Sequence, residues 1–92
     1  MPSEPIYLRW ENTTLPHNKF YELEIELSLF YPKRITRRWG RIGAHQPHAL
    51  HRWVDGPVEL EHQVALIDRR RHAHGYQRVN ALYSPIAEGL AA

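Results

Sequence analysis

The sequence predicts an α+β fold in which a mostly antiparallel β-sheet packs against one long α-helix. Two observations lead to this prediction. Apolar and polar residues alternate through residues 21–29, which is the period of a half-buried strand, whereas apolar residues recur at helical spacing after Pro57. A strand-rich chain with one helix buries the apolar face of its sheet against that helix. With 92 residues, 42% of them hydrophobic, the chain has room for one domain.

Four segments ahead of the helix have the character of strands. Residues 7–10 form a short β-prone run that ends in a cluster of turn formers. The alternating segment 21–29 is the clearest strand, and its period resumes over 35–42. We therefore expect these two segments to form an antiparallel hairpin with a loop near Pro32. Residues 49–54 supply a further hairpin strand.

The helix is signalled at both ends. Asp55 or Gly56 can cap its start, Pro57 suits its first turn, and Gly75 is placed to stop it. Between these signals, residues recur at i, i+4, i+7 and i+11: Leu60, Val64, Ile67 and Arg71. The basic side chains near the carboxyl end match the negative end of the helix dipole.

After the helix, residues 77–82 are expected to form an edge strand, and small residues near the end suggest that 84–92 is a loose C-terminal tail. The expected organisation is one domain over residues 1–92 with its core at about 7–79. No internal repeat is present in the sequence.

Composition excludes several classes of site. Because the chain has no cysteine, it has no disulfide, no thiolate zinc site and no cysteine nucleophile. The amino terminus lacks the pattern of a signal peptide, and no apolar run approaches the length of a membrane helix, so we expect a cytoplasmic protein without a membrane partner. The formal net charge is only +2, yet residues 33–54 carry six bases and no acid.

The centre of that basic block holds a tryptophan between arginines. In the strand period Arg37, Trp39 and Arg41 share one face, whereas Arg38 and Gly40 share the other. A tryptophan beside arginines offers a stacking plane and positive charge for a sugar, a base or a phosphate. The alternative is that the arginines only neutralise the glutamates of the neighbouring strand.

Three motifs occur in a fixed order along the chain. Lys19-Phe20-Tyr21 precedes the alternating strand, Trp39-Gly40-Arg41-Ile42-Gly43 follows it, and the helix ends at Arg71 before Gly75-Tyr76. In these motifs the chain resembles the WGR domain over about residues 7–79. WGR domains occur in poly(ADP-ribose) polymerases, where they contact DNA breaks and neighbouring domains, and as small stand-alone proteins in bacteria.

The resemblance implies roles for individual residues. Trp39 would pack against the sugar at a DNA terminus, Gly40 would allow close approach, and Arg41 would join DNA and partner-domain contacts. Lys19 would meet phosphate. The chain departs from bacterial relatives after Gly43, where it has Ala44 and His45 in place of an expected second glycine, and this puts the conformation of that loop in question.

Two functions remain open from the sequence. The first is a non-catalytic nucleic-acid-binding module that contacts the DNA backbone at ends or nicks, with Arg37 and Arg38 as further phosphate contacts. The second is a protein-interaction module that uses the same tryptophan and arginine surface without DNA. The position of three glutamates distinguishes the two functions: Glu22, Glu24 and Glu26. If these glutamates lie on the same face as Trp39, DNA affinity should be poor.

Catalysis has little support in the sequence. Neither a nucleophile elbow nor a phosphate-binding glycine-rich loop is present, so we expect no enzyme, no cofactor and no small-molecule substrate. His45, His48 and His51 recur every third residue, but in a loop running into a strand this spacing does not converge on a metal ion.

Overall fold

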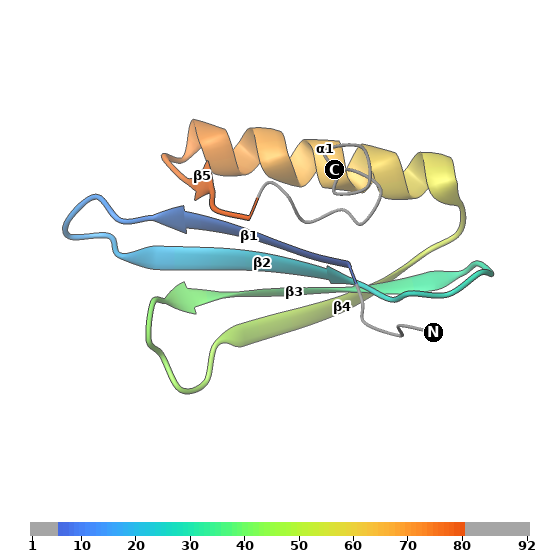
Figure 1. Cartoon of the computed structure of the whole chain (residues 1–92), viewed down its shortest axis with the longest axis horizontal. Helices are drawn as coiled ribbons and strands as arrows, with labels where there is room; N and C mark the ends of the chain where they lie inside the picture. Colours follow the sequence, from blue (N-terminus) through green and yellow to red (C-terminus); the bar gives the residue numbers. More distant parts are fainter. Residues whose placement is uncertain (1–5, 81–92) are drawn as a thin grey trace, which may run out of the picture.

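The computed structural model describes residues 6–80, which form a single five-stranded sheet with one helix on one face (Figure 1). In chain order, the elements are β1 (Ile6–Asn12), β2 (Lys19–Ile25), β3 (Lys33–Arg41), β4 (His48–Val54), α1 (Pro57–Ala73) and β5 (Gln77–Arg78). The sheet order is β4-β3-β2-β1-β5, and every pair of neighbours is antiparallel. The predicted α+β class is confirmed, with a helix of 17 residues. The tail expected at 84–92 lies outside the described residues, as does the end of the strand expected at 77–82.

The predicted length of the second strand is wrong at its carboxyl end. Alternation continues to residue 29, but β2 ends at Ile25. Ser28 closes a local turn there, because its hydroxyl accepts the backbone N–H of Phe30 and donates to the carbonyl of the same residue, both at 3.1 Å. Leu29 is consequently 91% exposed. The loop still falls near Pro32, as the hairpin prediction required.

The core lies between α1 and one face of the sheet. Its buried apolar side chains come from every strand except β5 and from the middle of the helix: Leu8, Trp10, Tyr21, Leu23, Ile25, Ile35, Val54 and Ile67. Trp10 is fully buried, and its indole N–H donates to Asp68 Oδ1 of α1 at 2.8 Å. This bond ties the helix to β1 and satisfies the one polar atom of the indole.

The helix ends as its sequence predicts. Gly56 is the N-cap, Pro57 occupies the first turn, and the Tyr76 N–H donates to the carbonyl of Arg71 at 2.9 Å past the last turn. Gly75 adopts a φ of +84°, and a Cβ at this position would lie 3.0 Å from the side-chain nitrogen Nδ2 of Asn12. Both conditions favour glycine at this helix terminus.

The helix covers the sheet diagonally, not along its strands. α1 follows β4 after two residues, and its carboxyl end lies over β1, where the Asn12 side-chain amide donates to the carbonyl of His74 at 3.2 Å. In Figure 1, α1 and β4 meet at the right of the view and diverge toward the left. The corner formed by the end of β3 and the start of β4 is therefore left uncovered by the helix. Within residues 6–80, no helix is long and apolar enough to cross a membrane.

The core predicts a sharp contrast between two leucines. Leu23→Ala removes a fully buried side chain and should lower the free energy of unfolding by about 2–5 kcal/mol. Leu29→Ala removes an exposed side chain and should change it by less than about 0.5 kcal/mol. Urea denaturation followed by tryptophan fluorescence measures both values, and equal effects of the two substitutions would contradict the placement of the core.

Candidate functional site

Three aromatic rings form a row across β2, β3 and β4 at the uncovered corner. Trp39 pairs in register with Tyr21 on one side and with His48 on the other. The Tyr21 and Trp39 rings stack with centroids 6.0 Å apart, and the Trp39 and His48 rings stack at 5.6 Å. Trp39 is half-buried and His48 is exposed, so the row leads from the edge of the core to solvent.

Basic side chains surround this row on the same face of the sheet. Arg37 and Arg41 lie two residues on either side of Trp39, and Lys19 is the register partner of Arg41. Because side chains alternate across a strand, these residues all share the face on which α1 packs. Lys19 and Arg41 are exposed, whereas Arg37 is half-buried.

The helix contributes one further cation. The Arg71 guanidinium carbon lies 4.3 Å from the centroid of the Tyr21 ring and 5.2 Å from that of Tyr76. These cation–π contacts hold the end of α1 against β2. They also bring a fourth positive charge to the edge of the aromatic row.

A cavity of about 310 Å³ opens between the helix end and the sheet at this point. It is lined by Tyr21, Arg37, Trp39, Leu50 and Arg71. The Nε atoms of both arginines are buried, and neither has a hydrogen-bond partner within the described part of the chain. The two arginines in its lining give the cavity a positive charge, which suits an anionic occupant.

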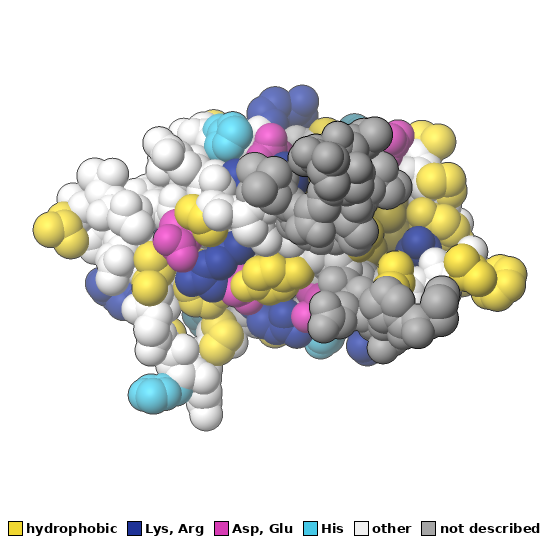
Figure 2. Space-filling view, viewed as in Figure 1, with side chains coloured by type: hydrophobic (Ala, Val, Ile, Leu, Met, Phe, Trp, Pro, Cys, Tyr) yellow, Lys and Arg dark blue, Asp and Glu magenta, His cyan; other side chains and the backbone are white. Residues whose placement is uncertain are grey.

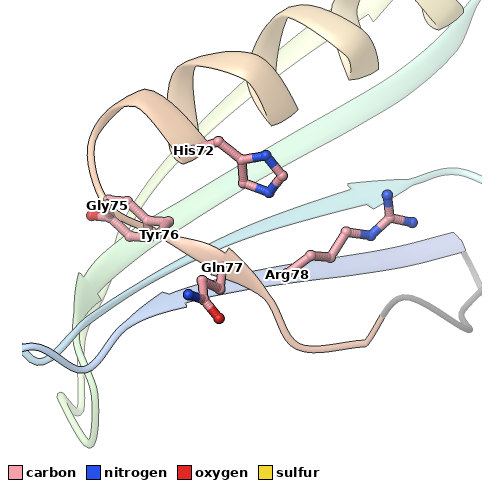
Figure 3. A pocket seen from close by; sticks show the side chains of 5 residues that line it. All are labelled: His72, Gly75, Tyr76, Gln77 and Arg78. Carbon is pink, nitrogen blue, oxygen red and sulfur yellow. The ribbon is translucent and has the colours of Figure 1, made fainter.

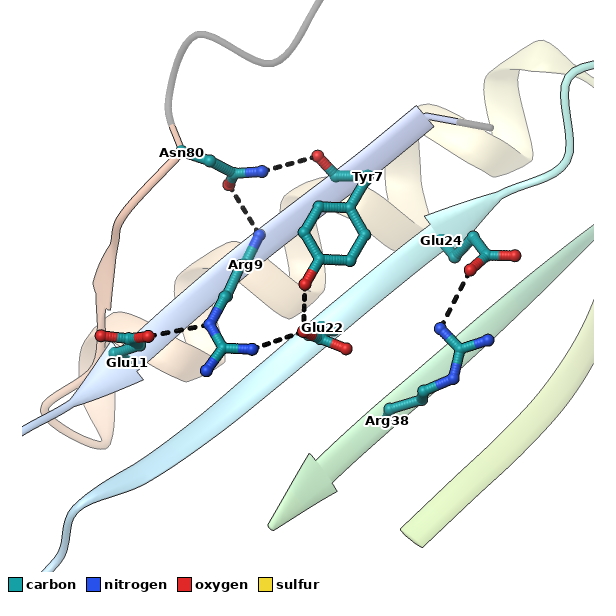
Figure 4. Close-up of polar contacts among 7 residues, drawn as sticks. All are labelled: Tyr7, Arg9, Glu11, Glu22, Glu24, Arg38 and Asn80. Atoms are coloured by element: carbon teal, nitrogen blue, oxygen red, sulfur yellow. Dashed lines mark hydrogen bonds and ion pairs between the residues drawn. The ribbon is translucent and has the colours of Figure 1, made fainter. Parts of the chain in front are cut away.

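The glutamates lie on the opposite face of the sheet (Figure 4). Glu24 pairs with Arg38 at 3.0 Å, and Glu22 accepts hydrogen bonds from the Arg9 guanidinium and the Tyr7 hydroxyl. Burial raises the pKa of Tyr7, and the hydrogen bond to Glu22 acts in the same direction. Burial alone would lower the pKa of Arg9, but hydrogen bonds to its partners outweigh it and raise that pKa. This face is thus internally neutralised.

The same mixing of charge is visible on the molecular surface. Figure 2 shows Lys and Arg side chains next to Asp and Glu side chains across the middle of the face in view. Apolar side chains gather at the right end of that view. Within residues 6–80, the two most exposed large apolar side chains, Leu29 and Leu15, lie in loops between strands.

The structure brings together five of the six residues expected at the site and separates the sixth. Lys19, Arg37, Trp39 and Arg41 share a face, and Gly40 lies in the strand between them. Arg38 points to the other face, where it pairs with Glu24. For Arg38 alone, the structure therefore matches the alternative in which arginine neutralises the neighbouring strand.

Glycine has different roles at two positions of the motif. A Cβ at Gly40 would point away from the Trp39 face and meet Phe20 and Pro47 at 3.7 Å, an ordinary van der Waals distance. Gly43 has a φ of +90° in the turn after β3, where the Ala44 N–H donates to the carbonyl of Arg41 at 3.0 Å. The loop thus turns without the second glycine.

A second cavity of about 540 Å³ lies between the end of α1 and β5. In Figure 3 the His72 ring and the Arg78 guanidinium project toward this space from the helix and the strand. Across residues 6–80, no group of three His, Asp or Glu side chains is arranged to hold a metal ion.

The comparison with protein families agrees with this geometry. The model of the WGR domain matches residues 4–81, nearly the whole chain. The chain belongs to the WGR domain family. A search of curated proteins found no match, and a search of solved structures found none either. The WGR domain is a non-catalytic family that is known as a nucleic-acid-binding module in proteins of the poly(ADP-ribose) polymerase type.

Two residues of the site in this WGR domain were not predicted from the sequence. Arg71 was attributed mainly to the helix dipole and to the family motif at the helix end, although it also covers Tyr21. His48 was treated as part of a histidine-rich loop, although it stacks on Trp39. The expected strand 49–54 begins one residue after His48, so the register that pairs His48 with Trp39 could not be predicted from it.

Substitution by alanine should destabilise the domain at Gly43 but not at Gly40. Gly43→Ala should lower the free energy of unfolding by about 1 kcal/mol or more, because alanine is strained at positive φ. Gly40→Ala should be neutral or stabilising by up to about 1 kcal/mol, because a strand position with room for a methyl group favours alanine. Thermal denaturation compares the two variants, and a larger loss for Gly40→Ala would refute this assignment.

Proposed function

We propose that this WGR domain binds the DNA backbone at ends or nicks. The sheet face that carries Trp39 makes the contact. The arrangement of charge supports this function. Glu22 and Glu24 point to the opposite face, so the basic side chains around Trp39 are not screened by the acidic strand. Lys19, Arg37 and Arg41 have no carboxylate partner within residues 6–80, so they can meet phosphate although the whole chain is nearly neutral.

Each part of the site has a role in this proposal. Trp39, whose ring is held between the rings of Tyr21 and His48, packs with its remaining exposed edge against a sugar or an unpaired base at the terminus. Arg41 and Lys19, both exposed, contact phosphates of the DNA backbone, and Arg37 contacts a third phosphate from the cavity. Arg38 takes no part.

Binding of this kind has little dependence on sequence. The helix covers the core, and Arg71 is its contribution to the site, so α1 is not presented to the major groove. Affinity then comes mainly from charge and falls with salt. Three phosphate contacts, by Lys19, Arg37 and Arg41, give a slope of log K against log salt of about −2.7.

The proposal is tested by fluorescence anisotropy with nicked, blunt-ended and circular duplexes at two salt concentrations. Trp39→Ala should weaken binding to nicked or blunt duplex by about 5- to 150-fold, the range expected for loss of one stacking contact. Arg41→Gln should weaken binding and reduce the magnitude of the salt slope by about 1.

Arg38→Gln is the matched control, because it removes a charge of the same strand on the other face. It should leave affinity within about twofold. Absence of binding at low salt, or binding that Trp39→Ala and Arg41→Gln both leave unchanged, would falsify the DNA proposal. A protein partner captured through the same two residues would instead support the interaction module.

A further inference from the structure

Strand β4 is an open edge of the sheet. It is the outermost strand in the order β4-β3-β2-β1-β5, and within residues 6–80 only β3 pairs with it. Its seven residues pair one to one with β3 without a bulge, and they include no proline. Alternate backbone N–H and C=O groups of such an edge point outward, where another extended chain can pair with them.

The arginine-lined cavity adjoins this edge. Leu50 of β4 lines it together with Arg37 of β3 and Arg71 of α1. The row of register partners across the sheet runs Leu23, Arg37, Leu50, so the next position in the row would belong to a strand added beside β4. The Nε atoms of Arg37 and Arg71 are buried and have no hydrogen-bond partner within residues 6–80.

The charge of this region selects the kind of partner. Residues 33–54 contain six bases and no acid, and this block includes all of β3 and β4. Pairing β4 with β4 of a second copy would bring two such blocks side by side, which like-charge repulsion disfavours. An acidic segment has the complementary charge.

We infer that β4 binds an extended acidic segment of another protein as a sixth strand. Neighbouring strands lie about 4.8 Å apart, so a glutamate beside Leu50 can extend its side chain over that leucine toward the Arg37 guanidinium. Its carboxylate then pairs with the Arg37 guanidinium, and Arg71 adds positive charge from the far side of the cavity. The backbone bonds supply affinity, and the carboxylate supplies specificity. This inference uses the strand edge and does not depend on DNA binding.

Three fluorescein-labelled peptides of ten residues test the inference on the full chain. The first alternates Thr and Glu, the second alternates Thr and Lys, and the third alternates Pro and Glu. The third keeps the negative charge but lacks alternate backbone N–H groups. We expect the Thr-Glu peptide to bind, the Pro-Glu peptide to bind at least about tenfold more weakly, and the Thr-Lys peptide not to bind.

Variants and amide exchange locate the binding. Arg37→Gln should weaken the Thr-Glu peptide at least about threefold, whereas Arg38→Gln on the opposite face should not change its affinity. Arg71 also supports the helix end, so an Arg71 variant would not separate binding from folding. The unaltered protein is measured instead: hydrogen exchange of the β4 amides should slow when the Thr-Glu peptide binds.

Several results would overturn the inference. Equal affinity for the Thr-Glu and Pro-Glu peptides would show attraction by charge alone. Unchanged exchange of the β4 amides would place the peptide elsewhere, and absence of binding by the Thr-Glu peptide would remove the site altogether.

Discussion

The register between β2 and β3 determines what each face of the sheet can do. Tyr21 lies opposite Trp39, and from this pair outward every second residue of both strands falls on the same side. A slip of one residue would exchange the two faces of β3 and bring Arg38 beside Tyr21. The observed register instead gives one face a stacked aromatic row with free cations and the other face a closed set of ion pairs.

The diagonal course of the helix turns one of these faces into both a core and a site. Trp10 and Ile67 fix α1 over the centre of the sheet, and the bond between Trp10 and Asp68 secures its position. The helix therefore ends before it reaches the corner of β3 and β4, and only the Arg71 side chain extends to that corner. The same apolar face that stabilises the fold thus continues into an uncovered surface, and Tyr21 belongs to both parts.

Much of this arrangement could be predicted from the sequence, because alternation and helix-end signals are local. The faces of β3 and the start of α1 follow from such patterns. Alternation of apolar and polar residues does not show whether a partner strand is present. The predicted strand therefore continued past Ile25, into a loop that Ser28 closes. Trp53 is a large apolar residue that is nevertheless 57% exposed, because it lies on the sheet face opposite the helix, and the sequence does not show which face of β4 the helix covers. The contact of Arg71 with Tyr21 joins residues 50 positions apart, and no local pattern contains it.

The three tryptophans provide the most direct test of which face binds DNA. Trp39 lies in the aromatic row, Trp10 is buried, and Trp53 is exposed on the opposite face, so each indole N–H signal in a proton–nitrogen NMR spectrum reports a different environment. Trp→Phe substitutions assign the signals. When a nicked duplex is added at low salt, the Trp39 signal should shift while the Trp10 and Trp53 signals stay in place. A shift of Trp53 with Trp39 unchanged would contradict the account.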